Sequence, residues 1–340
     1  MKYAEKLARL RMIRTKTIGS MTFSTLLKQY GSGVKAVEAL PDLMQRSGMK
    51  AVIATRQSVE AEMENADALG AKIVVRGEED FPEALMHFDD PPGCLTMLGH
   101  PHVGHQKAVA IVGSRNASIN SIAFAEHLAK DLSEQGYVIV SGLARGIDAT
   151  AHRGALEKGT IGVLAGGIDK MYPRENEKIY RRMAETGLVV TEMPLGTPAT
   201  ARLFPIRNRI IASLSLGTVV VEASTNSGSL ITARDASERG REVMTIPGNP
   251  MDDRSVGCNT LIRDGAHLVQ NADDIISLIR NNDLEMPDFK IRPPSRQTDM
   301  THVDASTAKV VVKAKKILDD LLSFDVTEVD ELIRRCHLSA

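Results

Sequence analysis

Glycines and basic residues follow several of the apolar runs in this sequence. Gly113-Ser114-Arg115 comes directly after the run at residues 109–112, and Gly142 and Arg145 follow the run at residues 138–140. Glycine allows a backbone to approach a ligand closely, and N–H groups at the start of a helix bind anions. Arginine forms paired hydrogen bonds with phosphate oxygens. These residue types, at these places, predict a site that binds phosphate groups.

Three later segments repeat the pattern. Residues 166–174 contain two glycines, a lysine and an arginine, and residues 202–209 contain three arginines and an asparagine. Residues 227–229 read Ser-Gly-Ser at the expected start of a helix. The alternative for the arginines is a structural cluster of salt bridges, and for Ser227 it is a plain N-cap. The candidate phosphate-binding residues are Gly113, Ser114, Arg115, Gly142, Arg145, Gly166, Gly167, Lys170, Arg174, Arg202, Arg207, Asn208, Arg209, Ser227, Gly228 and Ser229.

The segment from about residue 107 to residue 280 alternates apolar runs with amphipathic stretches. This alternation is typical of a mostly parallel sheet with helices on both faces, which is a doubly wound, Rossmann-like α/β fold. In such sheets the ligand binds at the carboxyl ends of the strands, near the point where the strand order reverses. Strands are expected at 109–112, 138–140, 160–164, 188–191, 217–222, 242–246 and 267–269, and helices near 118–135, 146–158, 175–186, 206–215, 228–239, 257–264 and 271–280.

The other segments extend this domain or flank it. Residues 1–70 contain short apolar periodicities separated by glycines, which predicts a SAM-like or helix-hairpin-helix domain with one helix ending before Pro41. Residues 71–106 contain expected strands at 72–75 and 94–98 that must join the sheet, so 71–280 is one Rossmann-like domain. Residues 281–306 are a polar, proline-bearing linker. Residues 307–340 have the pattern of the first helices of an incomplete winged-helix domain.

The composition narrows the class of protein. The net charge of −1 over 340 residues means that any basic site must be local. The three cysteines have neither metal-ligand nor disulfide spacing, which fits a reducing cytoplasm. We find no signal peptide and no apolar run long enough to span a membrane. Aromatic residues make up only 4%, which argues against rows of stacked bases, and Tyr172 is expected to pack against the fold.

The sequence gives little support for catalysis. It has no G-x-S-x-G elbow, P-loop or H-E-x-x-H motif, and Gly113-Ser114-Arg115-Asn116 lacks the G-x-G-x-x-G pattern of dinucleotide-binding folds. Glu192 and Glu222 end strands and form a candidate carboxylate pair, with nothing to place a substrate between them. We therefore expect a binding protein without cofactor or metal. A nucleotide-processing, phosphoribohydrolase-like enzyme and a passive scaffold are the alternatives.

Several motifs together resemble those of a known family. IVGSR, SGLARGIDATAH, VLAGGIDKMYP, FPIRNRIIASLS, VVVEA, SGSLITA and IPGN occur in the order and spacing of the DNA processing protein DprA family, also called Smf. The resemblance covers residues 71–280. The N-terminal helices resemble the SAM-like domain of that family, and the C-terminal helices resemble its winged-helix tail, which stops short here.

The resemblance implies a protein of natural transformation that binds single-stranded DNA and is not an enzyme. Such proteins protect incoming strands, load the recombinase RecA onto them, and form a homodimer through the Rossmann-like domain. The family's basic pocket matches Arg115, Arg174 and residues 202–209, and Lys170 is placed there by its position after a strand. The expectation is therefore that arginines and helix N-termini along one sheet edge bind successive phosphates without reading the base sequence.

Overall fold

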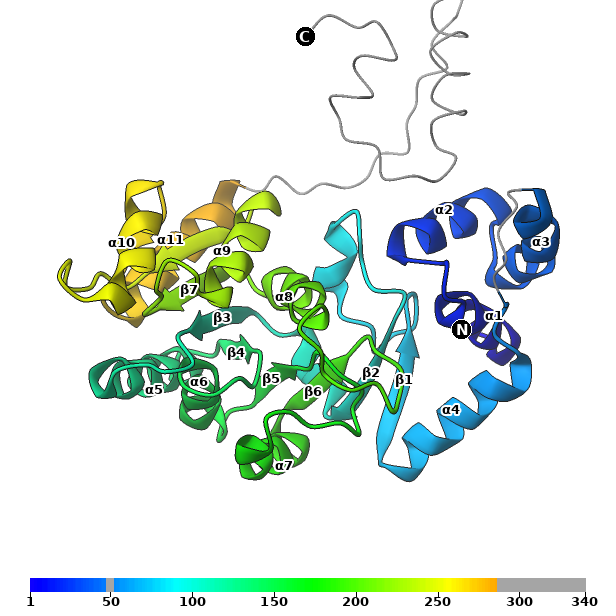
Figure 1. Ribbon diagram of the computed structural model, residues 1–340, viewed down its shortest axis with the longest axis horizontal. Coiled ribbons are helices and arrows are strands. Elements are labelled where there is room, and N and C mark those ends of the chain that lie inside the picture. Colours follow the sequence, from blue (N-terminus) through cyan, green and yellow to red (C-terminus); the bar gives the residue numbers. More distant parts are fainter. Residues whose placement is uncertain (47–51, 286–340) are drawn as a thin grey trace, which may run out of the picture. The chain divides into compact units, whose positions relative to one another are not determined.

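The computed structural model describes residues 1–46 and 52–285, so most of the expected linker and the whole expected winged-helix segment lie outside the described residues. The N-terminal part is helical, as predicted, with α1 (Tyr3–Arg14), α2 (Ser20–Tyr30), α3 (Gly33–Arg46) and α4 (Arg56–Ala68) (Figure 1). The prediction that a helix ends before Pro41 was wrong, because α3 continues through it. Proline removes one helical hydrogen bond, but the buried side chains of Leu40 and Met44 on either side keep this segment on the helical core.

One nine-stranded sheet forms the centre of the molecule, in the order β1-β2-β6-β5-β4-β3-β7-β8-β9. Strands β3 to β9 pair in parallel, whereas β1 and β2 join one edge antiparallel, which confirms the predicted mostly parallel fold. The strands are β1 (Ala71–Val75), β2 (Cys94–Gly99), β3 (Ala108–Gly113), β4 (Val138–Ser141), β5 (Thr160–Val163), β6 (Leu188–Thr191), β7 (Gly217–Val221), β8 (Glu242–Thr245) and β9 (His267–Leu268).

Helices cover both faces of this sheet. The strands are short, β-branched and buried on both sides, as a parallel sheet between two helical layers requires. Helices α8 (Leu203–Leu214), α9 (Gly228–Glu238) and α10 (Val256–Arg263) pack on one face. Helices α5 (Ile119–Glu134), α6 (Ile147–Ala155) and α11 (Ala272–Glu285) pack on the other face. Beside β6, α7 (Glu177–Thr186) continues the layer of α5 and α6 (Figure 1).

The strand order reverses between β3 and β7. Strands β4, β5 and β6 follow β3 toward one edge, and β7, β8 and β9 lead toward the other. The chain leaves β3 into α5 and leaves β7 into α9, so the N-termini of these two helices flank the switch point. A doubly wound sheet binds its ligand at this position. Within the described residues, no helix is long and apolar enough to cross a membrane.

Candidate phosphate-binding site

A pocket of about 710 Å³ opens at this switch point. The carboxyl end of β3, the start of α6, and the first turns of α8 and α9 form its walls. The residues that line it include Gly113, Ser114, Arg115, Asn116, Asp148, Tyr172, Phe204, Arg207, Asn208, Ser224, Asn226, Ser227, Gly228, Ser229 and Thr232. Hydroxyls, amides and guanidinium groups therefore line a pocket with two aromatic rings.

One wall of the pocket combines a cation with these rings. The guanidinium carbon of Arg115 lies 5.2 Å from the centre of the Phe204 ring, within the range of a cation–π contact. The ring of Tyr172 lies 6.0 Å from that of Phe204, and Tyr172 is 52% exposed. Tyr172 therefore packs against Phe204, as expected, but about half of it remains exposed to the pocket. This wall can offer a charge to a phosphate and a flat surface to a ring beside it.

Arg207 lines the pocket but is almost fully buried. Its guanidinium donates hydrogen bonds to the carbonyl oxygens of Gly142 and Val163, at the ends of β4 and β5. Burial lowers the pKa of Arg207 to about 10, the carboxylate of Asp148 opposes this shift, and the positive charge of Arg115 adds a smaller lowering. These hydrogen bonds connect α8 to the sheet. The charge of Arg207 also adds to the positive potential that Arg115 creates in the pocket.

Asp148 is an acidic residue on the pocket wall, but its carboxylate points into the protein. Its side chain is buried in the first turn of α6, where Oδ2 accepts a hydrogen bond from the backbone N–H of Gly142 at 3.1 Å. Burial raises the pKa of this carboxyl, and Arg207 opposes the shift. The carboxylate lies in the first turn of α6, where the helix dipole favours a negative charge, and its hydrogen bond joins the loop after β4 to this helix. Because Asp148 faces Arg207 and the backbone, the exposed Arg115 has no carboxylate partner among the residues that line the pocket.

The N-terminus of α9 opens into the pocket. Ser227 is the N-cap, and its hydroxyl bonds to the Ser229 hydroxyl at 2.7 Å. The backbone N–H of Gly228 has no acceptor within the described part of the chain. A Cβ built on Gly228 would meet no atom within 4 Å, and its φ angle is not left-handed. The packing of the protein therefore does not require glycine here, and the open space belongs to the pocket.

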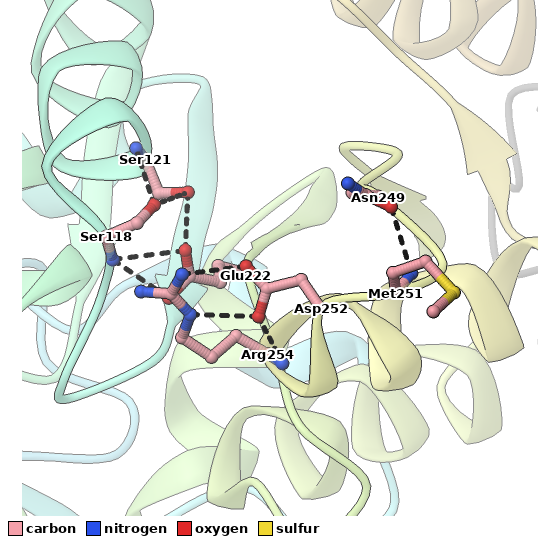
Figure 2. A network of polar contacts seen from close by, with 7 residues as sticks. All are labelled: Ser118, Ser121, Glu222, Asn249, Met251, Asp252 and Arg254. Atoms are coloured by element: carbon pink, nitrogen blue, oxygen red, sulfur yellow. Dashed lines mark hydrogen bonds and ion pairs between the residues drawn. The ribbon is translucent and has the colours of Figure 1, made fainter.

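The N-terminus of α5 differs from that of α9 because a carboxylate of the protein lies at it. The backbone N–H of Ser118, its N-cap, donates to both carboxylate oxygens of Glu222 at 3.0 and 3.1 Å, and the Ser121 hydroxyl donates to the same carboxylate at 2.8 Å (Figure 2). In the turn itself, the N–H of Ser114 donates to the carbonyl oxygen of Glu222. The Ser114 N–H is therefore used inside the protein, whereas the N–H groups of Arg115 and Ala117 have no acceptor among the described residues. The turn also presents the exposed Arg115 side chain.

The glycines at the other strand ends are explained by contacts inside the protein. A Cβ on Gly113 would collide with the carbonyl oxygen of Val221, and one on Gly142 would collide with the Arg207 guanidinium. Gly166 and Gly167 face the backbone of the loop at residues 194–199 in the same way. These glycines allow loops and side chains to pack closely, whereas the expectation was a close approach to a ligand.

The structure brings half of the candidate residues into the pocket. Those that line it are Gly113, Ser114, Arg115, Arg207, Asn208, Ser227, Gly228 and Ser229. Four candidate cations lie outside the lining but are exposed, namely Arg145, Lys170, Arg174 and Arg202. Arg145 follows Ala144 and Arg202 follows Ala201, two residues that line the pocket, so both lie at its rim. Lys170 pairs with Asp169 at 3.2 Å, and Arg145 lies 3.9 Å from Glu175.

Arg209 faces away from this pocket. Its guanidinium bonds to the carboxylate of Glu192 and to the backbone oxygen of Asp90, and it lines a separate cavity together with Arg14. This is the structural cluster that was the alternative for the arginines of 202–209. Glu192 is held at the end of β6 and Glu222 at the end of β7, with β5, β4 and β3 between them. At about 4.8 Å per strand they lie roughly 19 Å apart, so they do not form a carboxylate pair.

Several residues that line the pocket were not among the candidates, including Phe204, Tyr172, Asn116 and Asn226. Phe204 carried a signal that could have been used, because it lies between two candidate arginines at the start of a helix. The exposure of Tyr172 depends on how its loop folds over α8, which no local pattern reveals. Within residues 1–46 and 52–285, no cluster of histidine, cysteine and acidic side chains could hold a metal ion.

Comparisons with known proteins agree with this architecture. Residues 72–280 match the family model described as DNA recombination-mediator protein A, and residues 3–65 match the DprA-like N-terminal HHH domain. DNA processing protein DprA from Bacillus subtilis is 40% identical over 209 residues, which are 61% of this chain and 70% of that protein. Protein Smf from Escherichia coli is 38% identical over 224 residues, which are 65% of this chain and 60% of that protein.

Two solved structures are similar over most of their length. DNA processing protein A from Streptococcus pneumoniae superposes with a TM-score of 0.67 at 30% identity, covering 81% of this chain and 98% of that one. DNA processing protein A from Helicobacter pylori, a structure that concerns its single-stranded DNA binding mode, has a TM-score of 0.57 at 29% identity and covers 62% of this chain and 96% of that one. The fold, the motifs and the matched family model agree, and this chain belongs to the DNA recombination-mediator protein A family, DprA or Smf.

Proposed function

We propose that this protein binds single-stranded DNA, without preference for sequence, in the pocket between β3 and β7. The observation that carries the proposal is the wall on which the Arg115 guanidinium lies over the Phe204 ring, facing the open N-terminus of α9. A cation and the free N–H of Gly228 suit backbone phosphates, and the exposed ring of Tyr172 beside Phe204 suits a base. None of these groups reads the hydrogen-bonding edge of a base, so the binding should tolerate any sequence.

The pocket favours a polynucleotide over a small nucleotide. Arg115 and the start of α9 lie on different walls, and the exposed cations Arg145, Arg174 and Arg202 extend the positive charge beyond the pocket. One phosphate can engage only part of this surface, whereas successive phosphates of a strand can engage several of these groups. Because the net charge of the chain is only −1, this local concentration of arginines, rather than the charge of the whole protein, provides the attraction.

The family and its relatives extend the proposal to the biological role. We infer that the chain protects single strands during natural transformation, delivers them to the recombinase RecA and works as a homodimer, in the cytoplasm and without catalysing a reaction. The phosphoribohydrolase-like alternative loses its main support, because Glu192 and Glu222 are separated and each is bonded to other groups of the protein.

The proposal is tested by fluorescence anisotropy with a labelled 20-nucleotide oligo-dT. We expect the wild type to bind it, and to bind a mixed-sequence strand with similar affinity. Arg115→Ala should weaken binding about 10-fold or more, because it removes a charge-assisted contact. Arg181→Ala is the matched control, since Arg181 is an exposed arginine of α7 paired with Glu177 and remote from the pocket. Equal losses in both variants, or none in either, would refute the pocket assignment.

A further inference from the structure

The two helix N-termini at the switch point differ in what they can bind. The N-terminus of α9 is open, and its Gly228 faces empty space. The N-terminus of α5, the helix that directly follows the central strand β3, is occupied by a carboxylate of the protein itself, that of Glu222. In doubly wound folds that bind small nucleotides, the helix after the first central strand holds the phosphate. Here an internal anion lies at the equivalent place.

The contacts of Glu222 show that its position is specific. The side chain is 8% exposed, and its oxygens accept hydrogen bonds from the Ser118 N–H at 3.0 and 3.1 Å and from the Ser121 hydroxyl at 2.8 Å (Figure 2). These are two of the donors that a phosphate oxygen could use at the start of this helix. The backbone of Glu222 has φ of 56°, which is uncommon for a residue other than glycine. The fold therefore keeps a glutamate where glycine would fit the backbone better.

Arg254 lies beside this carboxylate without neutralising it through a direct ion pair. Its guanidinium binds both oxygens of Asp252, at 3.0 and 2.7 Å, and interacts only electrostatically with Glu222 (Figure 2). The groups around the α5 N-terminus are thus a buried carboxylate, its serine donors, and an arginine already paired with an aspartate. A phosphate approaching α5 would meet the negative charge of Glu222 and find the Ser118 N–H and the Ser121 hydroxyl already bonded to it. The N–H groups of Ile119 and Asn120 have no acceptor among the described residues, so the charge of Glu222 is the main obstacle.

We propose that Glu222 is a specificity-determining residue that excludes phosphate monoesters, such as mononucleotides, from the N-terminus of α5. The inference rests on the proposed function and adds a reason why the ligand is a polymer. With the Glu222 carboxylate at the N-terminus of α5, a single phosphate has only the N-terminus of α9 and the Arg115 side chain of the pocket to bind. A ligand gains affinity by engaging several such contacts at once, which a strand can do and a mononucleotide cannot.

The experiment removes the internal carboxylate while preserving the backbone. Glu222→Gly suits the left-handed φ and empties the site, and Glu222→Asn is neutral, shorter, and of a type that tolerates this φ. Asp253→Asn is the control, because it removes an exposed acidic charge from the neighbouring turn. Binding of thymidine 5′-monophosphate is measured by calorimetry, and stabilisation by inorganic phosphate is measured from the melting temperature.

We expect the affinity for thymidine 5′-monophosphate to rise at least 10-fold in Glu222→Gly and Glu222→Asn, and phosphate to raise the melting temperature of these variants alone. Wild type and Asp253→Asn should show neither gain. The inference is overturned if a variant that melts cooperatively shows a gain with neither thymidine 5′-monophosphate nor phosphate. It is also overturned if neither variant folds, because Glu222 then has only a structural role. The proposed function is judged separately, because it fails only if the wild type does not bind oligo-dT.

Discussion

The guanidinium of Arg115 lies over the ring of Phe204, 5.2 Å from its centre, although the two residues belong to different segments of the chain. Arg115 comes from the turn after β3, and Phe204 comes from the first turn of α8. Their contact joins the two elements at the switch point and gives the pocket a wall that is both cationic and aromatic. The predictions about binding depend on this wall.

Replacing Phe204 tests its aromatic part. We expect Phe204→Leu to weaken oligo-dT binding about 10-fold, because stacking of a base on an aromatic side chain is worth about 1–3 kcal/mol. The loss should be smaller when Arg115→Ala is already present, since the two side chains form one contact surface. The matched control is Phe88→Leu, because Phe88 also lies under arginines, Arg239 and Arg241, but does not line the pocket. Strict additivity in the double-mutant cycle would contradict the shared surface.

Filling the open space at α9 should block binding without harming the fold. A valine at Gly228 would meet no protein atom near its Cβ, so we expect Gly228→Val to melt within about 2 °C of the wild type and to lose most of its oligo-dT binding. Gly142→Ala gives the opposite comparison, because its Cβ would collide with the Arg207 guanidinium and should lower the melting temperature. Unchanged DNA affinity in Gly228→Val would mean that no strand passes the α9 N-terminus.

Arg207 should behave as a structural residue. We expect Arg207→Met to lower the free energy of unfolding by about 3–5 kcal/mol in urea denaturation, because it leaves Asp148 buried without its opposing charge. Adding Asp148→Asn should recover part of the loss, since the uncompensated carboxylate is then removed. If Arg207→Met unfolds like the wild type and loses only DNA affinity, Arg207 is a direct ligand contact and the role assigned to it is wrong.

His152 should make the fold sensitive to acid. Thr160 donates its hydroxyl proton to the Ile139 carbonyl, so the His152 Nδ1–H donates to the Thr160 oxygen and the buried Nε2 is left without a proton or a partner. Burial lowers the pKa of His152 to about 3, and the charge of Arg207 on α8 acts in the same direction. In the unfolded chain the pKa of histidine is about 6.5. Between these values the unfolded state binds more protons, so the stability that neutral His152 contributes above pH 6.5 is lost as the pH falls toward 3.

The expected contribution is a slope of about 1.4 kcal/mol per pH unit in the free energy of unfolding between pH 5 and 6. His152→Asn keeps a donor for Thr160 and removes the titration, so its stability should depend less on pH by about this amount. His127→Asn is the control, because His127 is an exposed histidine of α5 near Asp131. Parallel pH profiles for wild type and His152→Asn would show that His152 is not buried in its neutral form.

The fold could be predicted from local patterns because its strands are buried on both faces. Runs such as residues 109–112 and 217–221 can only be interior strands, and the alternation with helices fixes a parallel sheet. Arg207 and Arg209 are two residues apart on α8, and accordingly they bond to different parts of the protein. Pro41 misled the prediction because burial on both sides of it outweighs the cost of one missing helical hydrogen bond.

The site was less predictable because its character depends on contacts between distant segments. Nothing near Glu222 in the sequence shows that its carboxylate reaches Ser118, and nothing near Arg209 shows that Glu192 binds it. The glycines at strand ends indicated the correct sheet edge, but their conformational freedom serves internal packing. Local patterns therefore locate the site, whereas the tertiary structure decides which of its candidate groups face the pocket.

The most direct test of the account is the salt dependence of oligo-dT binding by wild type, Arg115→Ala and Arg181→Ala. For single strands, the slope of log affinity against log salt is about −0.7 per phosphate contact. If Arg115 binds a backbone phosphate, its removal should make the slope shallower by about 0.7, while Arg181→Ala keeps the wild-type slope. Equal slopes for all three proteins would show that Arg115 does not bind phosphate, and would contradict the assignment of this pocket to DNA.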